Sequence, residues 1–184
     1  MRIIGVCGYS GAGKSTFCRE MARRFQLPVL STGEIVRRRV AERGDPLTPE
    51  SIARVSDEIR RETGGRFLLV LERDLAGLGP GPAVLVDCLR EPSDRLALRE
   101  LSDRTALVAI TAADEVRASR LLARGRPGDP ASRAGLLALD EAERRLGAAG
   151  LLADADYVIG NDKDGLGPFV KRSAAVVERI LAGV

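Results

Sequence analysis

A chain of 184 residues with 45% hydrophobic and 30% charged side chains has the size and composition of one globular domain. A net charge of only +3 and 3% aromatic residues, with no tryptophan, argue against a nucleic-acid binder. The absence of histidine excludes an imidazole base or a histidine-ligated metal.

The cysteines, Cys7, Cys18 and Cys88, are odd in number and widely spaced, which argues against a disulfide framework or a zinc site. No apolar run approaches the roughly 18 residues of a membrane span, and the opening "MRIIGVCG" is too short for a signal sequence. These features predict a cytoplasmic protein with no membrane partner.

Short apolar runs alternate with helical patterns along the whole chain. In chain order we expect strands at 2–7, 27–31, 81–87, 105–111 and 156–160, and helices at 14–25, 33–43, 49–64, 67–78, 114–124, 136–149 and 166–182. The strands are continuously apolar, which is typical of a parallel sheet covered on both faces. The segment 124–135, rich in Arg, Gly and Pro, is expected to be a mobile loop within this single domain.

The first strand is followed by a phosphate-binding motif. "GYSGAGKS", residues 8–15, fits G-x-x-x-x-G-K-[ST] between a strand and a helix, the context that this motif requires. Its glycines let backbone N–H groups surround phosphate oxygens at a helix N-terminus. The residues predicted to bind the nucleotide phosphates are Gly8, Ser10, Gly11, Ala12, Gly13, Lys14, Ser15 and Thr16. Lys14 is also a predicted catalytic residue, because its charge reaches the β- and γ-phosphates.

An acidic residue on a second strand completes the pattern. Asp87 follows "AVLV", and a carboxylate at the end of a strand beside the first one can hold a Mg²⁺-bound water. Ser15 supplies a hydroxyl ligand. We therefore expect ATP and Mg²⁺ as cofactors, GTP not being excluded, with Ser15 and Asp87 at the metal.

Three classes of protein carry such a motif: small-molecule kinases, switch GTPases and remodelling ATPases. A GTPase needs D-x-x-G and N-K-x-D, whereas this chain has "DCLR" and "NDKD". Remodelling ATPases are usually larger. A small-molecule kinase is the favoured class.

Three further stretches favour a particular kind of kinase. "STGEIVR" (31–37) resembles S-T-G-D-M-L-R of adenylate kinases, and "VDCLR" (86–90) resembles their L-D-G-F-P-R. "SRLLARGR" (119–126) is similar to the start of their arginine-bearing lid. Over nearly its full length the chain is more similar still to an archaeal P-loop family related to adenylate kinases and dephospho-CoA kinases.

This resemblance implies a three-layer α/β/α P-loop fold with strand order 2-3-1-4-5. Residues 33–78 would form an acceptor-binding helical subdomain, and 124–135 the lid. The acceptor would be held by Thr32, Arg37 and Arg90. Lid or catalytic cations would be Arg120, Arg124, Arg126 and Arg133, and Asn161 would border the donor base.

Helix geometry refines the arginine assignment. Successive helical residues are rotated by about 100°, so only one of Arg37, Arg38 and Arg39 can face the cleft, and Arg37 is the prediction. A guanidinium offers a fixed fork that matches phosphate oxygens.

The acceptor stays open between two kinds of small molecule. A nucleoside monophosphate offers an anionic oxygen and needs cations and alignment. Dephospho-CoA offers a hydroxyl that needs a base, for which Glu34 is the candidate. The "STGE…R" pattern favours a phosphate acceptor, and a regulator with slow ATP hydrolysis is the alternative outside the kinases.

Overall fold

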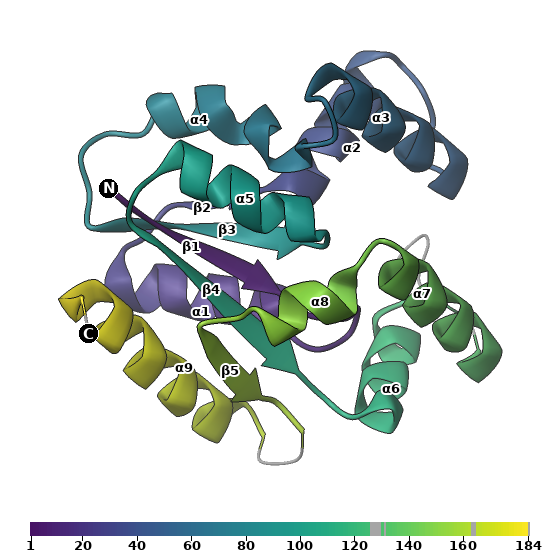
Figure 1. Ribbon diagram of the computed structural model, residues 1–184. Coiled ribbons are helices and arrows are strands. Elements are labelled where there is room, and N and C mark those ends of the chain that lie inside the picture. The colour runs from purple at the N-terminus through teal and green to yellow at the C-terminus, as the bar shows by residue number, and fades with distance from the viewer. Residues whose placement is uncertain (126–129, 131, 163–164, 184) are drawn as a thin grey trace.

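The computed structural model describes residues 1–125, 130, 132–162 and 165–183 of the chain. Its centre is a five-stranded parallel sheet in the order β2-β3-β1-β4-β5 (Figure 1). The strands are β1 (Arg2–Cys7), β2 (Val29–Ser31), β3 (Ala83–Leu89), β4 (Thr105–Thr111) and β5 (Tyr157–Gly160). The predicted strand order is confirmed.

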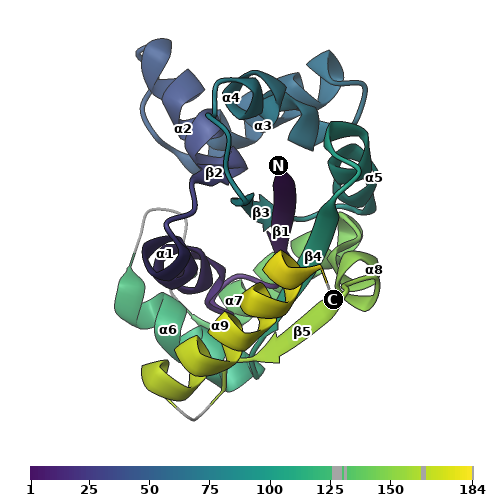
Figure 2. The same ribbon diagram turned by 90° about the vertical axis from the view of Figure 1, so that its left-hand side faces the viewer.

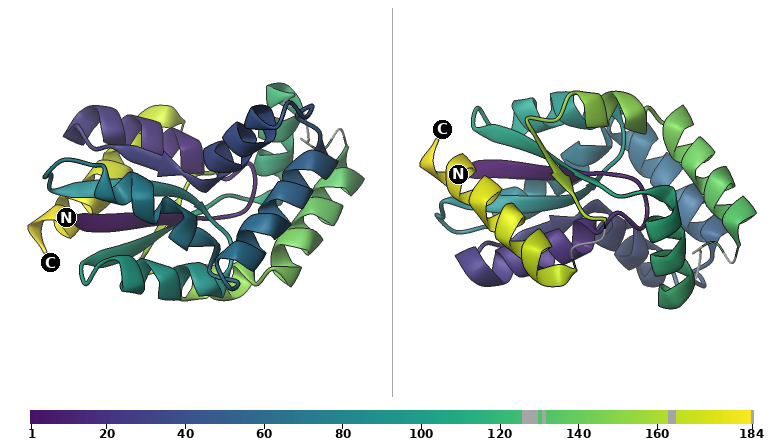
Figure 3. Two further views of the ribbon diagram at one scale, coloured as in Figure 1. Left: turned by 90° about the horizontal axis from the view of Figure 1, so that it is seen from above. Right: turned by 90° about the horizontal axis from the view of Figure 1, so that it is seen from below.

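Helices connect these strands and cover the sheet. They are α1 (Lys14–Phe25), α2 (Thr32–Glu42), α3 (Pro49–Glu62), the 3₁₀ helix η1 (Phe67–Leu71), α4 (Glu72–Ala76), α5 (Pro92–Leu101), α6 (Asp114–Arg124), α7 (Arg133–Arg145), α8 (Ala148–Ala153) and α9 (Leu166–Ala182). Both termini lie at the end of the sheet opposite α6 and α7 (Figures 1 and 3).

Alternate residues of β1, β3 and β4 enter two separate cores, which makes the fold three-layered. Ile4 and Val6 of β1 pack with α1 and α9 through residues such as Phe17 and Phe169. Ile3 and Cys7 of the same strand pack on the other face, against α5, η1 and α8. Figure 2 shows α1 and α9 on one side of the sheet and α5 and α8 on the other.

A third, smaller core joins α2 to α3 at one edge of the molecule. Val36 and Val40 of α2 pack against Val55 and Ile59 of α3, and all four are fully or nearly fully buried. The α3 N-terminus is the predicted one: Thr48 and Ser51 cap each other's backbone N–H groups in a capping box. Thus α2, α3, η1 and α4 build a helical unit beside the sheet within residues 32–76.

The structure corrects several expected boundaries. Strand β3 continues to Leu89, so Asp87 lies within the strand and not at its end, because the buried Leu89 still pairs with Cys7. Helices α6 and α7 include the two ends of the expected 124–135 loop, and residues 126–129 and 131 lie outside the described part. The sequence did not predict α5 and α8. Residues 67–78, expected as one helix, form η1 followed by α4.

Within the described part of the chain, no helix combines the length and the apolar character that a membrane crossing requires.

Candidate phosphate cavity and acceptor pocket

The 8–15 loop joins β1 to α1, and its geometry depends on glycine. Gly13 has φ 111°, and an added Cβ would lie 2.3 Å from Asn161 Nδ2. Gly8 has φ 144°, and its Cβ would lie 2.3 Å from the carbonyl oxygen of Ile110 on β4. Both positions therefore require a residue without a side chain.

Lys14 begins α1 and lies over this loop. Its Nζ donates to the carbonyl oxygens of Gly8 at 2.6 Å and Tyr9 at 3.2 Å. These backbone oxygens hold its ammonium group at the edge of the 8–15 loop. No carboxylate among the described residues pairs with it.

Arg120 and Asn161 contact the carbonyl oxygens of the loop. Arg120 of α6 donates to the carbonyl oxygen of Asn161 at 2.8 Å and approaches those of Gly11 and Ala12 at 3.4–3.5 Å. The Asn161 amide donates to the Ala12 carbonyl at 2.8 Å. The loop after β5 is therefore tied to the phosphate loop.

Ser15 and Asp87 meet where β3 lies beside β1. The Ser15 hydroxyl donates to Asp87 Oδ2 at 3.1 Å, and Asp87 is only 7% exposed. The other carboxylate oxygen, Oδ1, is buried without a hydrogen-bond partner. A hydroxyl beside a carboxylate with an unused oxygen fits Mg²⁺, which binds one or two protein groups together with substrate phosphates and waters. Among the described residues, no group of three His, Cys, Asp or Glu side chains is placed to hold a metal ion.

A cavity of about 490 Å³ opens in front of the loop. It is lined by one carboxylate, Asp87, and by six cations: Lys14, Arg19, Arg37, Arg90, Arg120 and Arg124. Ser10, Gly11, Gly13, Ser15 and Thr16 also line it. Such an excess of positive charge in a concave site favours a polyanionic ligand.

Among the three consecutive arginines of α2, only Arg37 lines this cavity. Arg39 pairs with Glu62 at 2.6 Å, and Arg38 approaches Asp74 at 3.8 Å and Glu42 at 3.9 Å. Arg37 has no carboxylate partner in the described part of the chain. The side chain predicted to face the cleft is therefore the one that lines it.

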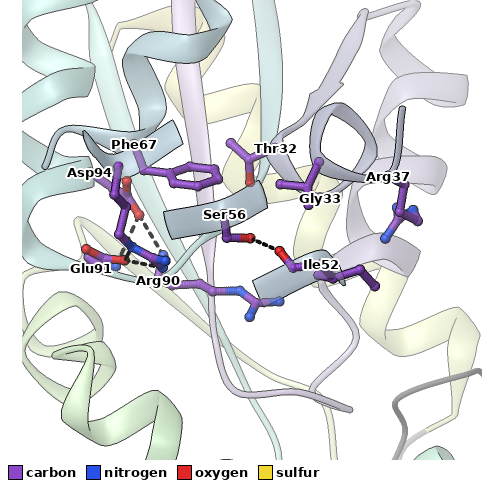
Figure 4. Close-up of a pocket in the computed structure, with 11 residues that line it drawn as sticks. Thr32, Gly33, Arg37, Ile52, Ser56, Phe67, Arg90, Glu91 and Asp94 are labelled. Atoms are coloured by element: carbon purple, nitrogen blue, oxygen red, sulfur yellow. Dashed lines mark hydrogen bonds and ion pairs between the residues drawn. The ribbon is translucent and has the colours of Figure 1, made fainter. Parts of the chain in front are cut away.

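A second pocket, of about 120 Å³, adjoins the first. Gly33, Arg37 and Arg90 line both. The smaller pocket is also lined by Thr32, Val36, Ile52, Ser56, Arg60, Phe67, Glu91 and Asp94. Figure 4 shows the Arg90 side chain extending into this pocket from the side of Glu91 and Asp94, with Phe67 and Ser56 above it. We call it the acceptor pocket, after the role that the sequence predicts for Thr32, Arg37 and Arg90, which line it.

The floor of the acceptor pocket contains a buried acid. Asp94 accepts from the backbone N–H groups of Arg90 at 2.8 Å and Glu91 at 3.1 Å, and its Oδ1 has no partner. Burial raises the pKa of Asp94 from 3.8 to about 6, against the opposing effect of these hydrogen bonds. Glu91 is held by Arg60, whose Nη2 lies 2.7 Å from its carboxylate.

Cys7 lies at the end of β1, directly before the loop. Burial raises the pKa of the Cys7 thiol to about 12. The group is therefore neutral and packs as a core residue.

Some predicted residues lie elsewhere. Glu34 is exposed in the first turn of α2 and lines neither pocket. Arg133 lies at the start of α7, 3.9 Å from Glu115 and away from the phosphate cavity. Gly8, Ala12 and Asn161 shape the loop from behind without lining the cavity. Arg126 lies outside the described residues.

Four further residues at the loop were not predicted from the sequence. Arg19, one helical turn after Ser15, lines the phosphate cavity, and its i+4 spacing from Ser15 was the available signal. Arg117, Asp140 and Glu143 contact the loop through Ser10 or each other. The spacing of Arg117 from Arg120 and Arg124 puts the three on one helix face, but nothing local identified the two acids.

A family model described as an AAA domain matches residues 4–143 of the chain. The chain is 36% identical over 162 residues to UPF0200 protein PAE1629 of Pyrobaculum aerophilum, with 88% of each protein covered. The chain belongs to the AAA domain family and to the UPF0200 proteins.

Solved structures show the fold of this UPF0200 chain. A gluconokinase from Sinorhizobium meliloti superposes with a TM-score of 0.63 at 22% identity, covering 99% of this chain and 94% of the other. A shikimate kinase from Acinetobacter baumannii gives a TM-score of 0.57 at 19% identity, with 100% and 94% covered. The UPF0200 chain thus has a P-loop kinase fold. The comparisons do not single out the adenylate kinases or the dephospho-CoA kinases, so the expected resemblance holds at this coarser level.

Proposed function

We propose that the protein transfers the γ-phosphoryl group of ATP, with Mg²⁺, to a nucleoside monophosphate or a similar small phosphorylated acceptor. The observation that carries the proposal is the junction of the two pockets. Arg37 and Arg90 line both, so each would lie between a phosphate on the acceptor side and the transferred group on the donor side.

The donor half rests on the loop and the cations around it. Backbone N–H groups of the loop and the Lys14 ammonium would hold the β- and γ-phosphates, and Arg120 and Arg124 would add charge on the α6 side. Ser15 and Asp87 would hold Mg²⁺, which when bound neutralises charge on the β- and γ-phosphates.

The acceptor half rests on guanidinium groups and not on a base. An oxygen of the acceptor phosphate would attack the γ-phosphorus, the bond from that phosphorus to the β,γ-bridging oxygen would break, and ADP would leave. Because the attacking oxygen is already anionic, the step needs alignment and cations but no proton acceptor. Thr32 would help to place the acceptor phosphate beside Arg37.

The position of Glu34 weighs against the dephospho-CoA alternative. A hydroxyl acceptor needs a base within hydrogen-bond reach of it. Glu34 is exposed and lines neither pocket, whereas the arginines that a phosphate acceptor needs do line them.

The test is ADP formation from Mg²⁺-ATP with a panel of acceptors: AMP, CMP, UMP, GMP, their deoxy forms and dephospho-CoA. We expect at least one monophosphate to raise the rate above that without acceptor. Stimulation by dephospho-CoA alone would contradict the proposal and point to Glu34. ATP binding with no stimulation by any acceptor would favour a nucleotide-binding regulator.

A further inference from the structure

The phosphate loop is held from outside the cavity at one residue, Ser10. Glu143 of α7 accepts from the Ser10 backbone N–H at 3.1 Å and from the Ser10 hydroxyl at 2.8 Å. Arg117 of α6 donates to the Ser10 carbonyl oxygen at 3.0 Å. Two helices that are distant in sequence from the loop therefore fix every polar group of this residue.

The acids that reach Ser10 and Arg117 come from one face of α7. Asp140 and Glu143 are three residues apart, so they lie on neighbouring turns. Asp140 binds the Arg117 guanidinium at 2.8 Å and 2.5 Å, and the same guanidinium lies 5.3 Å from the Tyr9 ring centroid. The hydrogen bonds with Asp140 raise the pKa of Arg117 above its ordinary value, so its guanidinium stays protonated. The Arg117–Asp140 pair thus joins α6 to α7 directly behind the loop.

Glu143 differs from Asp140, the other buried acid of this cluster. It is 4% exposed, yet within the described chain both of its hydrogen bonds come from Ser10 and none from an arginine. A buried carboxylate is destabilising unless its oxygens are hydrogen-bonded. Glu143 therefore depends on the conformation of the phosphate loop, and the loop depends on Glu143.

The direction of the Ser10 N–H shows what this contact does for the loop. Ser10 lines the phosphate cavity, but its N–H is turned onto Glu143. The following residue, Gly11, has φ 81°, and a Cβ there would lie 2.9 Å from the Arg117 carbonyl oxygen. The loop therefore packs against α6 at Gly11 and is hydrogen-bonded to α7 at Ser10. Of the N–H groups that follow, that of Ala12 donates to the Tyr9 carbonyl oxygen at 3.1 Å within the loop.

We propose that Glu143 is a positioning residue that sets the phosphate loop in its nucleotide-binding conformation through Ser10. It touches neither nucleotide nor acceptor. Its effect is on affinity for the nucleotide phosphates, because a loop that must be ordered on binding has a lower affinity than one that is already ordered. The inference rests on the donor half of the proposed function and is independent of the acceptor's identity.

The experiment measures Mg²⁺-ATP binding by calorimetry for the wild type and for Glu143→Ala. We expect the dissociation constant to rise about ten-fold, the change for a free-energy difference of about 1.4 kcal/mol, which is typical of a hydrogen bond to a charged group. Glu143→Gln should restore most of the affinity, because its amide oxygen can still accept from the Ser10 N–H. The matched control is Glu141→Gln, since Glu141 lies on the same helix but, among the described residues, pairs with Arg144 and Arg145 at the surface.

A double-mutant cycle distinguishes positioning from a direct contact of Ser10 with the phosphates. Ser10→Ala removes only the hydroxyl, and we expect it to weaken ATP binding in the wild type but to have little further effect in Glu143→Ala. An equal loss in both backgrounds would overturn the proposal. If Glu143→Ala does not fold, Glu143→Leu, which fills a similar volume but cannot accept from Ser10, serves as the second background.

The outcomes separate this inference from the function on which it rests. Wild-type affinity in Glu143→Ala, even with a lower melting temperature, would mean that Glu143 is only structural. If the wild-type protein itself does not bind Mg²⁺-ATP, the proposed function fails, and this inference fails with it.

Discussion

Arg37, Arg38 and Arg39 follow one another on α2, yet their surroundings differ completely. Helix rotation predicts that only one faces the cleft, and the neighbouring acids decide the outcome. Glu42, Asp74 and Glu62 lie near Arg38 and Arg39, while Arg37 lines both pockets. Rotation along the helix limited the choice to one arginine, and the resemblance to adenylate kinases named Arg37, whose contact with an acceptor stays a prediction.

Arg37→Ala tests the acceptor assignment. If Arg37 holds the acceptor phosphate, its loss should raise the acceptor KM and lower kcat, together by about ten- to hundred-fold in kcat/KM. ATP affinity should change little. The measurement is steady-state kinetics with the acceptor that the panel identifies, alongside calorimetry with ATP.

The neighbouring Arg38→Ala is the matched control for this variant. It removes the same charge from the same helix, but its partners are surface acids at 3.8–3.9 Å. Its kinetics should resemble those of the wild type. An equal fall in ATP affinity and acceptor affinity in Arg37→Ala would remove Arg37 from the acceptor site.

Other residues could not be predicted because their roles depend on contacts across the fold. Ser10 and Glu143 are 133 positions apart, and no local pattern links them. Glu34 is the converse case. Glu34 was the candidate base for a hydroxyl acceptor, but its side chain is exposed, and its backbone N–H donates to the Ser31 hydroxyl that caps α2.

At the scale of elements, the best predictions are those with strong periodicity and clear ends. β1, α1, β4, α6 and α9 have the expected boundaries. The helix expected at 136–149 is instead divided, because Gly147 adopts φ 93° and a Cβ there would lie 2.6 Å from Pro92 Cδ of α5. That close approach is tertiary, so the sequence pattern alone did not reveal it.

The missed helix α5 had its own local signals. Pro92 occupies its first turn, and Glu91 and Asp94 form a capping box. These signals follow directly after "VDCLR" (86–90). Asp94 is therefore in the first turn of α5 and also lines the acceptor pocket.

Asp94 should make the stability of the protein depend on pH. Its pKa in the fold is about 6 against an ordinary 3.8, so the folded state binds the proton more tightly. The stabilisation from this group is complete below about pH 4 and is lost as the pH rises through 6. The slope is at most about 1.4 kcal/mol per pH unit.

Asp94→Asn should abolish this contribution, because an uncharged amide has no burial penalty that grows with pH. We expect the free energy of unfolding of the variant, relative to wild type, to increase between pH 4 and 6. Urea denaturation across this range is the measurement. A difference that is constant with pH would contradict a raised pKa for Asp94.

At the scale of the whole molecule, the parallel sheet explains why distant segments share one cleft. In a sheet of this kind the segments that follow the strands gather at one edge. The loop after β1, Arg90 after β3 and Asn161 after β5 are all at that edge, and β2 leads directly into α2 with Arg37. The alternation of strands with helices and the continuously apolar strands predicted the three layers. The strand order came from the family resemblance.

Ligand binding to such a cleft should stabilise the entire fold. At a concentration one hundred times its dissociation constant, a ligand adds about 2.7 kcal/mol to the free energy of unfolding. For a domain of this size each kcal/mol shifts Tm by about 2–4 °C, so saturating Mg²⁺-ATP should raise Tm by about 5–10 °C. Calorimetry or circular dichroism during heating provides the measurement.

Lys14→Ala should abolish most of this rise in Tm, because it removes the cation at the edge of the phosphate loop. Lys171→Ala removes an equal charge from the exposed face of α9, far along the chain from the loop, and should keep the wild-type shift. If nucleotide raised Tm equally in both variants, binding would not depend on the phosphate loop. In the phosphoryl-transfer assay Lys14→Ala should likewise lose most of its rate, and Lys171→Ala should keep the wild-type rate. Both readouts depend on the same bound nucleotide.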